Sequence, residues 1–160
     1  MKARVKIKKK PDVVLKKLEK IASKMDGPGT VKVGLPKGSN NYPDGTSIIM
    51  VGTVHEFGSP SRNIPQRSYL RSTINGNRKK YLGMLKKLAT KITKENMSPL
   101  KALNLLGLQV KSDVQSKIRA IKQPPLKSPS KKRIGEGKEG ANPLIDTGHL
   151  IQSIQYKVEE

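Results

Sequence analysis

The chain has 160 residues, no cysteine and a net charge of +21, from 33 Lys and Arg against 12 Asp and Glu. The lack of cysteine excludes disulfides, thiolate metal sites and a cysteine nucleophile, and no apolar run has the length of a membrane span. With 34% hydrophobic and 3% aromatic residues, we expect one domain with a thin aliphatic core, which gains stability by burying surface against copies of itself.

The first part of the chain is predicted to hold a basic arm, a helix and a strand. Residues 1–11 are basic with alternating apolar residues, as in an edge strand or a disordered arm, and no apolar run follows that would make a signal peptide. Asp12 suits the N-cap of a helix that extends to Met25, since apolar residues recur at helical spacing. Residues 30–35 alternate as a strand, and Pro, Gly and Asn in residues 36–46 indicate a loop.

The middle of the chain begins with a short apolar segment. Residues 48–57 fit a buried strand or a short helix, and we favour a helix with Thr46 or Ser47 as its N-cap and Gly58 at its end. Residues 59–77 are predicted to form an ordered loop without regular structure.

Two long helices are expected next. One spans residues 77–96, and the other begins with Ser98 as N-cap and Pro99 at its first position. Their predicted core faces are Leu82, Leu85, Leu88, Ala89 and Ile92 in the first, and Leu103, Leu106, Val110, Val114, Ile118 and Ile121 in the second. We expect these apolar faces to form core rather than a cofactor site.

The last part of the chain contains a long segment without hydrophobic periodicity. Residues 122–142 are rich in Lys, Pro and Gly, and are predicted to be a functional arm or disordered. A short helix capped by Thr147 and a final strand over residues 153–158 follow. We therefore expect one α+β domain over residues 12–160: a small mixed or antiparallel sheet with two long helices packed on it, plus the flexible basic arm and loop.

Two short motifs invite an enzymatic interpretation. Asp146-Thr147-Gly148 matches the aspartic protease triplet, but such enzymes need two carboxylates and an all-β frame, so a homodimer would be required. The alternative is that Asp146 and Thr147 cap a helix and Gly148 permits a tight turn. His55-Glu56 begins like a zinc protease motif, but the second histidine is missing. We expect no catalytic, metal or cofactor site.

The charge favours a negatively charged partner, most often nucleic acid and otherwise an acidic protein, although lysine-rich surfaces are often only solvated. Stacking aromatics, zinc fingers and a convincing helix-turn-helix are absent from the sequence, so any contact would be with the phosphate backbone and independent of base sequence. The candidate residues for contact with DNA or a partner are Lys127, Lys131, Lys132, Arg133 and Lys138.

Two segments in a fixed order carry a resemblance. The first reads His55-Glu56-Phe57-Gly58 and then Asn63-Ile64-Pro65-Gln66-Arg67-Ser68-Tyr69-Leu70-Arg71. The second reads Pro143-Leu144-Ile145-Asp146-Thr147-Gly148-His149-Leu150. This order resembles the tail-component, or virion morphogenesis, family of tailed bacteriophages, over roughly residues 30 to 158. The chain departs from the family's Arg-Pro-Phe, having Arg67-Ser68-Tyr69 instead.

The resemblance implies a structural role in tail completion or head–tail joining, with no catalysis. It implies a virion protein at the neck or top of the tail, assembled in the host cytoplasm as a homo-oligomeric ring, with a hexamer as the suggested size. Other neck and tail proteins would be its partners. Apart from the resemblance, the basic loop could face packaged DNA by non-specific contact, and no membrane is expected as a partner because no apolar stretch is long enough to span one. The alternative function is a basic protein that binds nucleic acid independently of sequence.

The quoted residues also suggest a local structure. Glu56 and Arg67 could form an ion pair that holds the loop 59–71 against Phe57, with Pro65 fixing the backbone at the turn. Such motifs would serve either the fold of one subunit or a direct contact between subunits.

Overall fold

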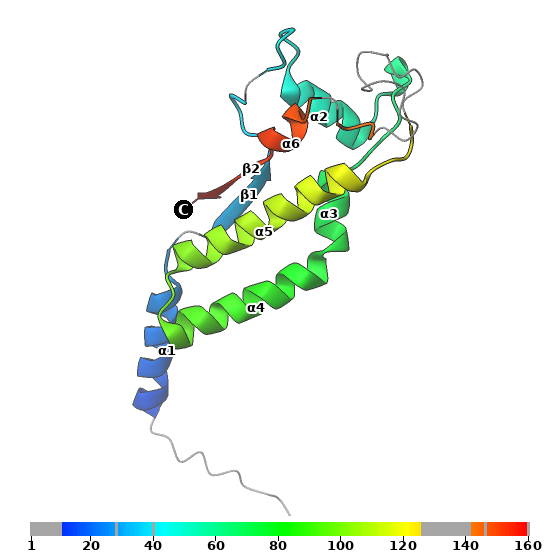
Figure 1. The fold of residues 1–160 in the computed structure, drawn as a ribbon. Helices are drawn as coiled ribbons and strands as arrows, with labels where there is room; N and C mark the ends of the chain where they lie inside the picture. Colours follow the sequence, from blue (N-terminus) through cyan, green and yellow to red (C-terminus); the bar gives the residue numbers. More distant parts are fainter. Residues whose placement is uncertain (1–10, 28, 40, 126–141, 146, 160) are drawn as a thin grey trace, which may run out of the picture.

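The computed structural model describes residues 11–27, 29–39, 41–125, 142–145 and 147–159. Most of the predicted N-terminal arm (residues 1–10) and most of the basic loop (residues 126–141) lie outside these residues. The described elements are α1 (Pro11–Met25), β1 (Thr30–Gly34), α2 (Ile48–Phe57), the 3-10 helix η1 (Pro60–Arg62), α3 (Leu70–Gly76), α4 (Arg78–Glu95), α5 (Pro99–Ala120), α6 (His149–Ser153) and β2 (Gln155–Glu159). This arrangement confirms the predicted α+β class (Figure 1).

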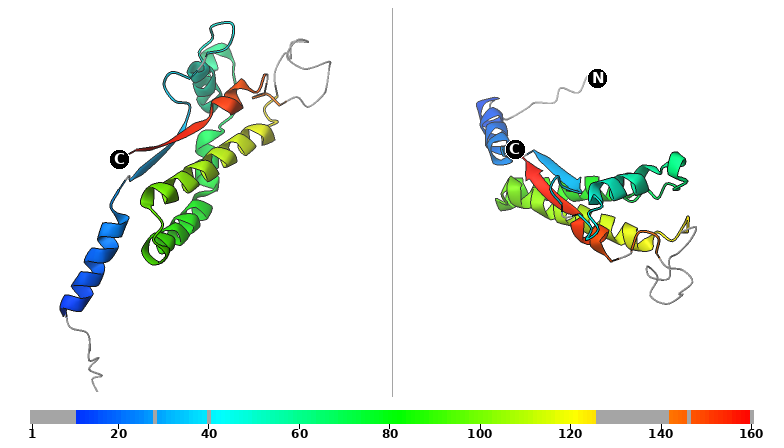
Figure 2. Two further views of the ribbon diagram at one scale, coloured as in Figure 1. Left: turned by 60° about the vertical axis from the view of Figure 1, so that its left-hand side comes forward. Right: turned by 90° about the horizontal axis from the view of Figure 1, so that it is seen from above.

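The two strands form an antiparallel pair that joins the beginning of the domain to its end. Val31 pairs with Val158 and Val33 with Tyr156. Helix α5 packs along this sheet, and α4 packs against α5 (Figures 1 and 2). Gly107 makes the close approach of α5 to the sheet possible, because a Cβ at this position would overlap the ring of Tyr156.

The core lies between α5, the sheet and α2. Its fully buried members are Ile48, Val114, Ile118 and Ile154. The prediction of a purely aliphatic core was wrong, because Tyr69 and Tyr81 are also buried. Tyr81 is accommodated because its hydroxyl donates a hydrogen bond to Asp113 at 2.9 Å, which satisfies the polar end of a buried ring.

The apolar face predicted for α4 is only partly in the core. Leu88 and Ile92 are buried, but Leu82 is 49% exposed and Leu85 is 39% exposed. The prediction was wrong for these two leucines, because α5 covers only one side of α4 and the described part of the chain provides no second layer. Helix α4 therefore presents leucines to solvent.

Helix α1 extends away from the rest of the domain at the end where α4 finishes (Figures 1 and 2). Its contact with the domain is made near its last turn, where Lys24 Nζ donates to Thr93 O at 3.1 Å and to Asn96 Oδ1 at 2.6 Å. Leu18 remains 57% exposed, so the apolar side chains of α1 do not join the core.

The segment 59–77 is not the irregular loop that its sequence suggested. It contains η1 and, from Leu70, helix α3. The position before α3 is Tyr69, whose side chain makes no capping hydrogen bond. One residue earlier, Ser68 Oγ accepts the backbone N–H of Ser72 at 3.2 Å, and the remaining free N–H groups of the first turn are bonded by a side chain from elsewhere in the chain.

Candidate functional site

The carboxylate of Glu56 caps helix α3. Glu56 lies in the last turn of α2, is 4% exposed, and accepts hydrogen bonds from the backbone N–H groups of Tyr69 (2.9 Å), Leu70 (2.8 Å) and Arg71 (3.1 Å). The hydroxyl of Ser68 adds a fourth bond at 2.7 Å. A negative charge at the positive end of a helix, bonded to its free N–H groups, is stabilising. Glu56 thereby fixes α3 to the end of α2.

Arg71 is the ion-pair partner of Glu56. Its Nε lies 3.0 Å from Glu56 Oε1, and its Nη2 donates to the backbone carbonyl of Glu56 at 3.1 Å. The guanidinium also lies over the Phe57 ring, 4.3 Å from the ring centroid, in a cation–π arrangement. The predicted pair between Glu56 and Arg67 was wrong, because the N-terminal turn of α3 brings Arg71 rather than Arg67 to the carboxylate.

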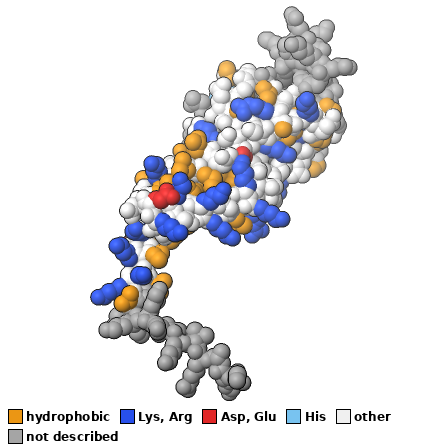
Figure 3. Space-filling view, turned by 60° about the horizontal axis from the view of Figure 1, so that its bottom comes forward, with side chains coloured by type: hydrophobic (Ala, Val, Ile, Leu, Met, Phe, Trp, Pro, Cys, Tyr) orange, Lys and Arg blue, Asp and Glu red, His pale blue; other side chains and the backbone are white. Residues whose placement is uncertain are grey.

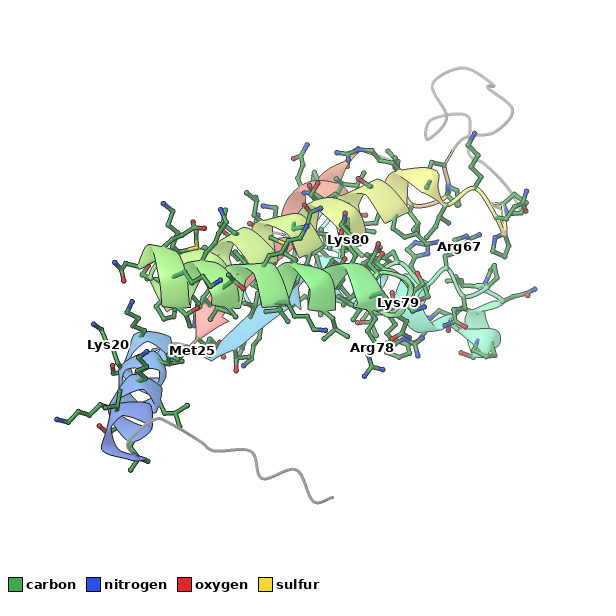
Figure 4. The ribbon with its side chains drawn as sticks, turned by 90° about the horizontal axis from the view of Figure 1, so that it is seen from below. Lys20, Met25, Arg67, Arg78, Lys79 and Lys80 are labelled. Carbon is green, nitrogen blue, oxygen red and sulfur yellow. The ribbon has the colours of Figure 1, made fainter. Side chains whose placement is uncertain are left out.

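Arg67 binds a distant segment of the chain. Its side chain is buried, and it donates from Nε to Pro124 O at 2.7 Å and from Nη2 to Pro125 O at 2.8 Å. Its backbone N–H donates to His55 O at 2.7 Å. Arg67 therefore ties α2 to the residues immediately before segment 126–141, and Figure 4 shows it at the end of the molecule opposite α1. Burial lowers the pKa of Arg67, which nevertheless stays charged because guanidinium titrates far above neutral pH.

The hydrogen bonds to Glu56 keep its carboxylate ionised. Burial alone would raise the pKa of Glu56, but the bonds from Leu70 N–H, the Ser68 hydroxyl and Arg71 outweigh it, so the pKa lies below its ordinary value of 4.5. This carboxylate has no free proton to donate near neutral pH, and its hydrogen-bonding capacity is taken up by α3. It is a structural group rather than a general acid.

The loop between Glu56 and α3 forms a tight turn. Ser59 and Ile64 bond each other through their backbones, at 2.8 and 3.0 Å. Gly58 adopts φ 76°, a conformation that glycine tolerates best, at the end of α2. An open pocket of about 580 Å³ lies beside this turn. Its lining is Phe57, Gly58, Ser59, Pro60, Asn63, Ile64, Pro65, Gln66, Pro124 and Pro125.

The second motif segment packs against the first. Pro143 and Leu144 are buried, and Asn142 Nδ2 holds their position by donating to the carbonyls of Ile118 (2.8 Å) and Arg119 (2.7 Å) at the end of α5. Leu150 on α6 is buried against α2, where it meets Gly52. The structure thus brings both segments to one end of the molecule, around α2 and α6 (Figure 1).

Helix α6 begins differently from the prediction. Gly148, at φ 77°, is the N-cap residue and has no side chain that could cap the helix, while Thr147 is exposed. The prediction that Thr147 caps α6 was therefore wrong, since the chain enters the helix through a left-handed glycine. Asp146 lies outside the described residues, as do all five basic candidates, Lys127, Lys131, Lys132, Arg133 and Lys138.

The sequence did not indicate a second polar cluster on α4 and α5. Asp113 accepts hydrogen bonds from Lys80 (2.7 Å), Tyr81 (2.9 Å) and Gln109 (3.0 Å). Burial would raise the pKa of Asp113, but these bonds lower it below its ordinary value. Only the spacing from Gln109 to Asp113, one helical turn, was visible in the sequence. The cluster joins the two long helices.

The sequence did not indicate three further residues of the site. They are Arg71, which pairs with Glu56, and Pro124 and Pro125, whose carbonyls bind Arg67. No local spacing rule links Glu56 to a residue fifteen positions later, and a carbonyl acceptor has no sequence signature. Within the described ranges, no three His, Asp or Glu side chains gather as a metal site would require. No helix of the described residues is long and apolar enough to cross a membrane.

No family model, curated protein or solved structure matches the chain. The resemblance to phage tail components therefore rests on the quoted residues.

Proposed function

We propose that this protein is a structural subunit of a tailed bacteriophage particle, located at the neck or the top of the tail and acting in a ring. The observation that carries the proposal is the joint packing of the two motif segments that resemble the phage family. Glu56 and Leu150, one from each segment, lie at the same end of the molecule around α2 and α6. The motif residues fix loops and helix ends, which is the work expected of a structural protein.

Exposed apolar side chains support the homo-oligomeric part of the proposal. Fourteen large hydrophobic residues of the described part are more than one third exposed. They are Val13, Leu15, Leu18, Ile21, Met25, Ile49, Met50, Phe57, Ile74, Leu82, Leu85, Leu100, Leu105 and Leu108. Single exposed apolar residues are normal, but grouped ones indicate surfaces that become buried in an assembly. Repeated structural subunits usually assemble with closed symmetry.

The positive charge supports a weaker contact with packaged DNA. Lys and Arg side chains are spread over the face seen in Figure 3, with hydrophobic side chains exposed between them. This distribution also favours the alternative function, binding of nucleic acid without sequence preference. The two functions differ in how they depend on salt, because phosphate contacts weaken steeply as salt rises and apolar contacts do not.

The test is the particle mass of the purified chain by light scattering, at low and high salt, with and without double-stranded DNA. A phage ring subunit gives a discrete oligomer that survives high salt and needs no DNA. A monomer that coats DNA, with log K falling about 0.9 per phosphate neutralised for each unit of log salt, would overturn the proposal in favour of the alternative.

The variant in which all five basic candidates of segment 126–141 become Gln separates DNA contact from ring formation. We expect it to keep the oligomer mass and to show a smaller salt slope. A five-fold Lys→Gln variant at Lys16, Lys20, Lys86, Lys94 and Lys101, which lie in helices, serves as the charge-matched control. If both variants lose the same slope, the segment has no special part in DNA contact.

A further inference from the structure

Helix α1 carries an apolar face without a partner among the described residues. Leu15 is 56% exposed, Leu18 57%, Ile21 43% and Met25 50%. These positions follow one another by three or four residues, so they share one side of the helix. Lys20 lies on the opposite side, which leaves the apolar face free of that charge.

A second apolar surface, the groove, lies between β1 and helices α3, α4 and α5. It is open and has a volume of about 540 Å³. Its lining is Val31, Val33, Leu70, Arg71, Ile74, Asn75, Tyr81, Leu106 and Val110. Arg71 is the charged member of this lining, and its guanidinium is already paired with Glu56. An apolar helix face can therefore enter the groove without burying an unpaired charge.

The α1 helix of the same chain is held away from this groove. Lys24 fixes the end of α1 to Thr93 and Asn96, at the last turn of α4, whereas Tyr81 of the groove lies in the first turn. At about 1.5 Å per residue, twelve residues of helix separate the two sites by roughly 18 Å. Figures 1 and 4 show α1 directed away from the body of the domain. To fill its own groove, α1 would have to release Lys24 and reverse direction within residues 26–29.

We propose that α1 of one subunit packs its apolar face into the groove of a second copy of this chain. This inference rests on the proposed ring-forming function and names the contact that builds the ring. The helix and the groove are different patches of one molecule, so each subunit gives one helix and receives another. Such a head-to-tail contact generates a ring when its rotation closes.

The need for area favours a second copy over an unrelated protein. A specific interface buries about 800 Å² on each partner, more than one half-exposed helix face supplies. In a ring each subunit makes this contact twice, because it gives its helix to one neighbour and receives a helix from the other, so copies of one chain together cover both exposed surfaces. The lysines on the other side of α1 stay in solvent, which limits repulsion between two strongly basic chains.

Cysteine cross-linking tests this contact directly, because the chain has no cysteine of its own. Leu18→Cys and Ile74→Cys are made in separate proteins, mixed and oxidised. Both side chains are substantially exposed, so neither change disturbs the core. A disulfide requires the two Cα atoms to lie within about 7 Å. The proposed contact brings residue 18 of one copy beside residue 74 of another, so we expect a disulfide-linked dimer in the mixture. The matched control, Lys20→Cys mixed with Ile74→Cys, should cross-link several-fold less, because Lys20 faces away from the groove.

The double variant, Leu18→Cys with Ile74→Cys in one chain, identifies the occupant. Exchange between copies gives a ladder of linked multimers, whose largest member counts the subunits of the ring. An internal disulfide in a monomer would show that α1 fills its own groove, and would overturn the proposal. A salt-resistant oligomer by light scattering without the mixed cross-link would overturn the helix contact and leave the ring intact. A chain that stays monomeric and does not cross-link would overturn both.

Discussion

The carboxylate of Glu56 accepts the backbone N–H of Leu70 at 2.8 Å, so the last turn of α2 supplies the cap for the first turn of α3. Leu70 comes fourteen positions after Glu56, and the intervening turn is closed by the bonds between Ser59 and Ile64. The corner made by α2, the turn and α3 therefore depends on one buried charge.

Replacing Glu56 should destabilise the fold strongly. Glu56→Ala removes the acceptor for three backbone N–H groups and the Ser68 hydroxyl, and we expect a loss of about 3 kcal/mol in the free energy of unfolding. Glu56→Gln keeps one carbonyl acceptor and should lose less. Denaturant unfolding measures both. Glu95→Gln is the control, because its pair with Lys91 is exposed and 3.8 Å long, and should change stability by less than about 0.5 kcal/mol. Equal effects at residues 56 and 95 would contradict the capping role.

The stability of the fold should fall in mild acid. Glu56 and Asp113 have folded-state pKa values below their ordinary values of 4.5 and 3.8. In this range the unfolded chain binds more protons than the folded one, so their contribution is complete above about pH 5 and is lost as pH falls through the folded values. Thermal unfolding between pH 6 and pH 3 checks this, and the double variant Glu56→Gln with Asp113→Asn should show a flatter profile.

Two helical glycines should respond in opposite ways to alanine. A Cβ at Gly107 would overlap the Tyr156 ring and force α5 away from the sheet, so Gly107→Ala should cost about 1–3 kcal/mol. Nothing lies within 4 Å of a Cβ at Gly83 in α4, so Gly83→Ala should stabilise by up to about 1 kcal/mol. Thermal unfolding of the two variants decides the matter. A stable Gly107→Ala protein would show that α5 lies further from the sheet than described.

The coupling energy between Glu56 and Arg71, which form the observed ion pair, should exceed that between Glu56 and Arg67, which were expected to pair. A double-mutant cycle on Glu56 and Arg71, using Gln at both positions, should give a coupling energy of about 0.5–3 kcal/mol. The same cycle on Glu56 and Arg67 should give less, because Arg67 bonds to the carbonyls of Pro124 and Pro125. Exchanging the charges of Glu56 and Arg67 should not restore stability. A rescue by that exchange would mean that the two side chains do meet.

The starts of α2 and α5 were predicted correctly, because both carry local cap signals. Ser47 accepts a hydrogen bond from Met50 N–H at the start of α2, and Ser98 accepts one from Lys101 N–H at the start of α5, with Pro99 in the first turn. Helix α3 was missed because the carboxylate that bonds three N–H groups at its start, Glu56, comes from another helix, and its local cap, Ser68, was not recognised. Periodicity predicted that α4 is amphipathic, but it could not reveal that α5 covers only one of its sides, which leaves Leu82 exposed.

The sequence identified several residues of the candidate site but not the contacts that they make. Glu56 and Arg67 were both selected from the sequence, and both are buried. Their partners were not predictable, because a helix amide and a proline carbonyl are backbone groups that any residue could supply. Asn142 likewise holds its segment through the carbonyls of Ile118 and Arg119. A sequence motif can single out a side chain, but it cannot show which backbone carbonyl will accept a hydrogen bond from that side chain.

The hydrogen bonds from Arg67 to Pro124 O and Pro125 O bear on which sequence changes the next segment tolerates. The hydrogen bonds from Arg67 to backbone carbonyls do not require particular side chains in the residues that follow, since every residue carries the same carbonyl. Changes in the length or charge of segment 126–141 therefore need not affect the contact between Arg67 and α2. A variant of this chain with a different segment 126–141 should therefore keep the bonds from Arg67 to both carbonyls.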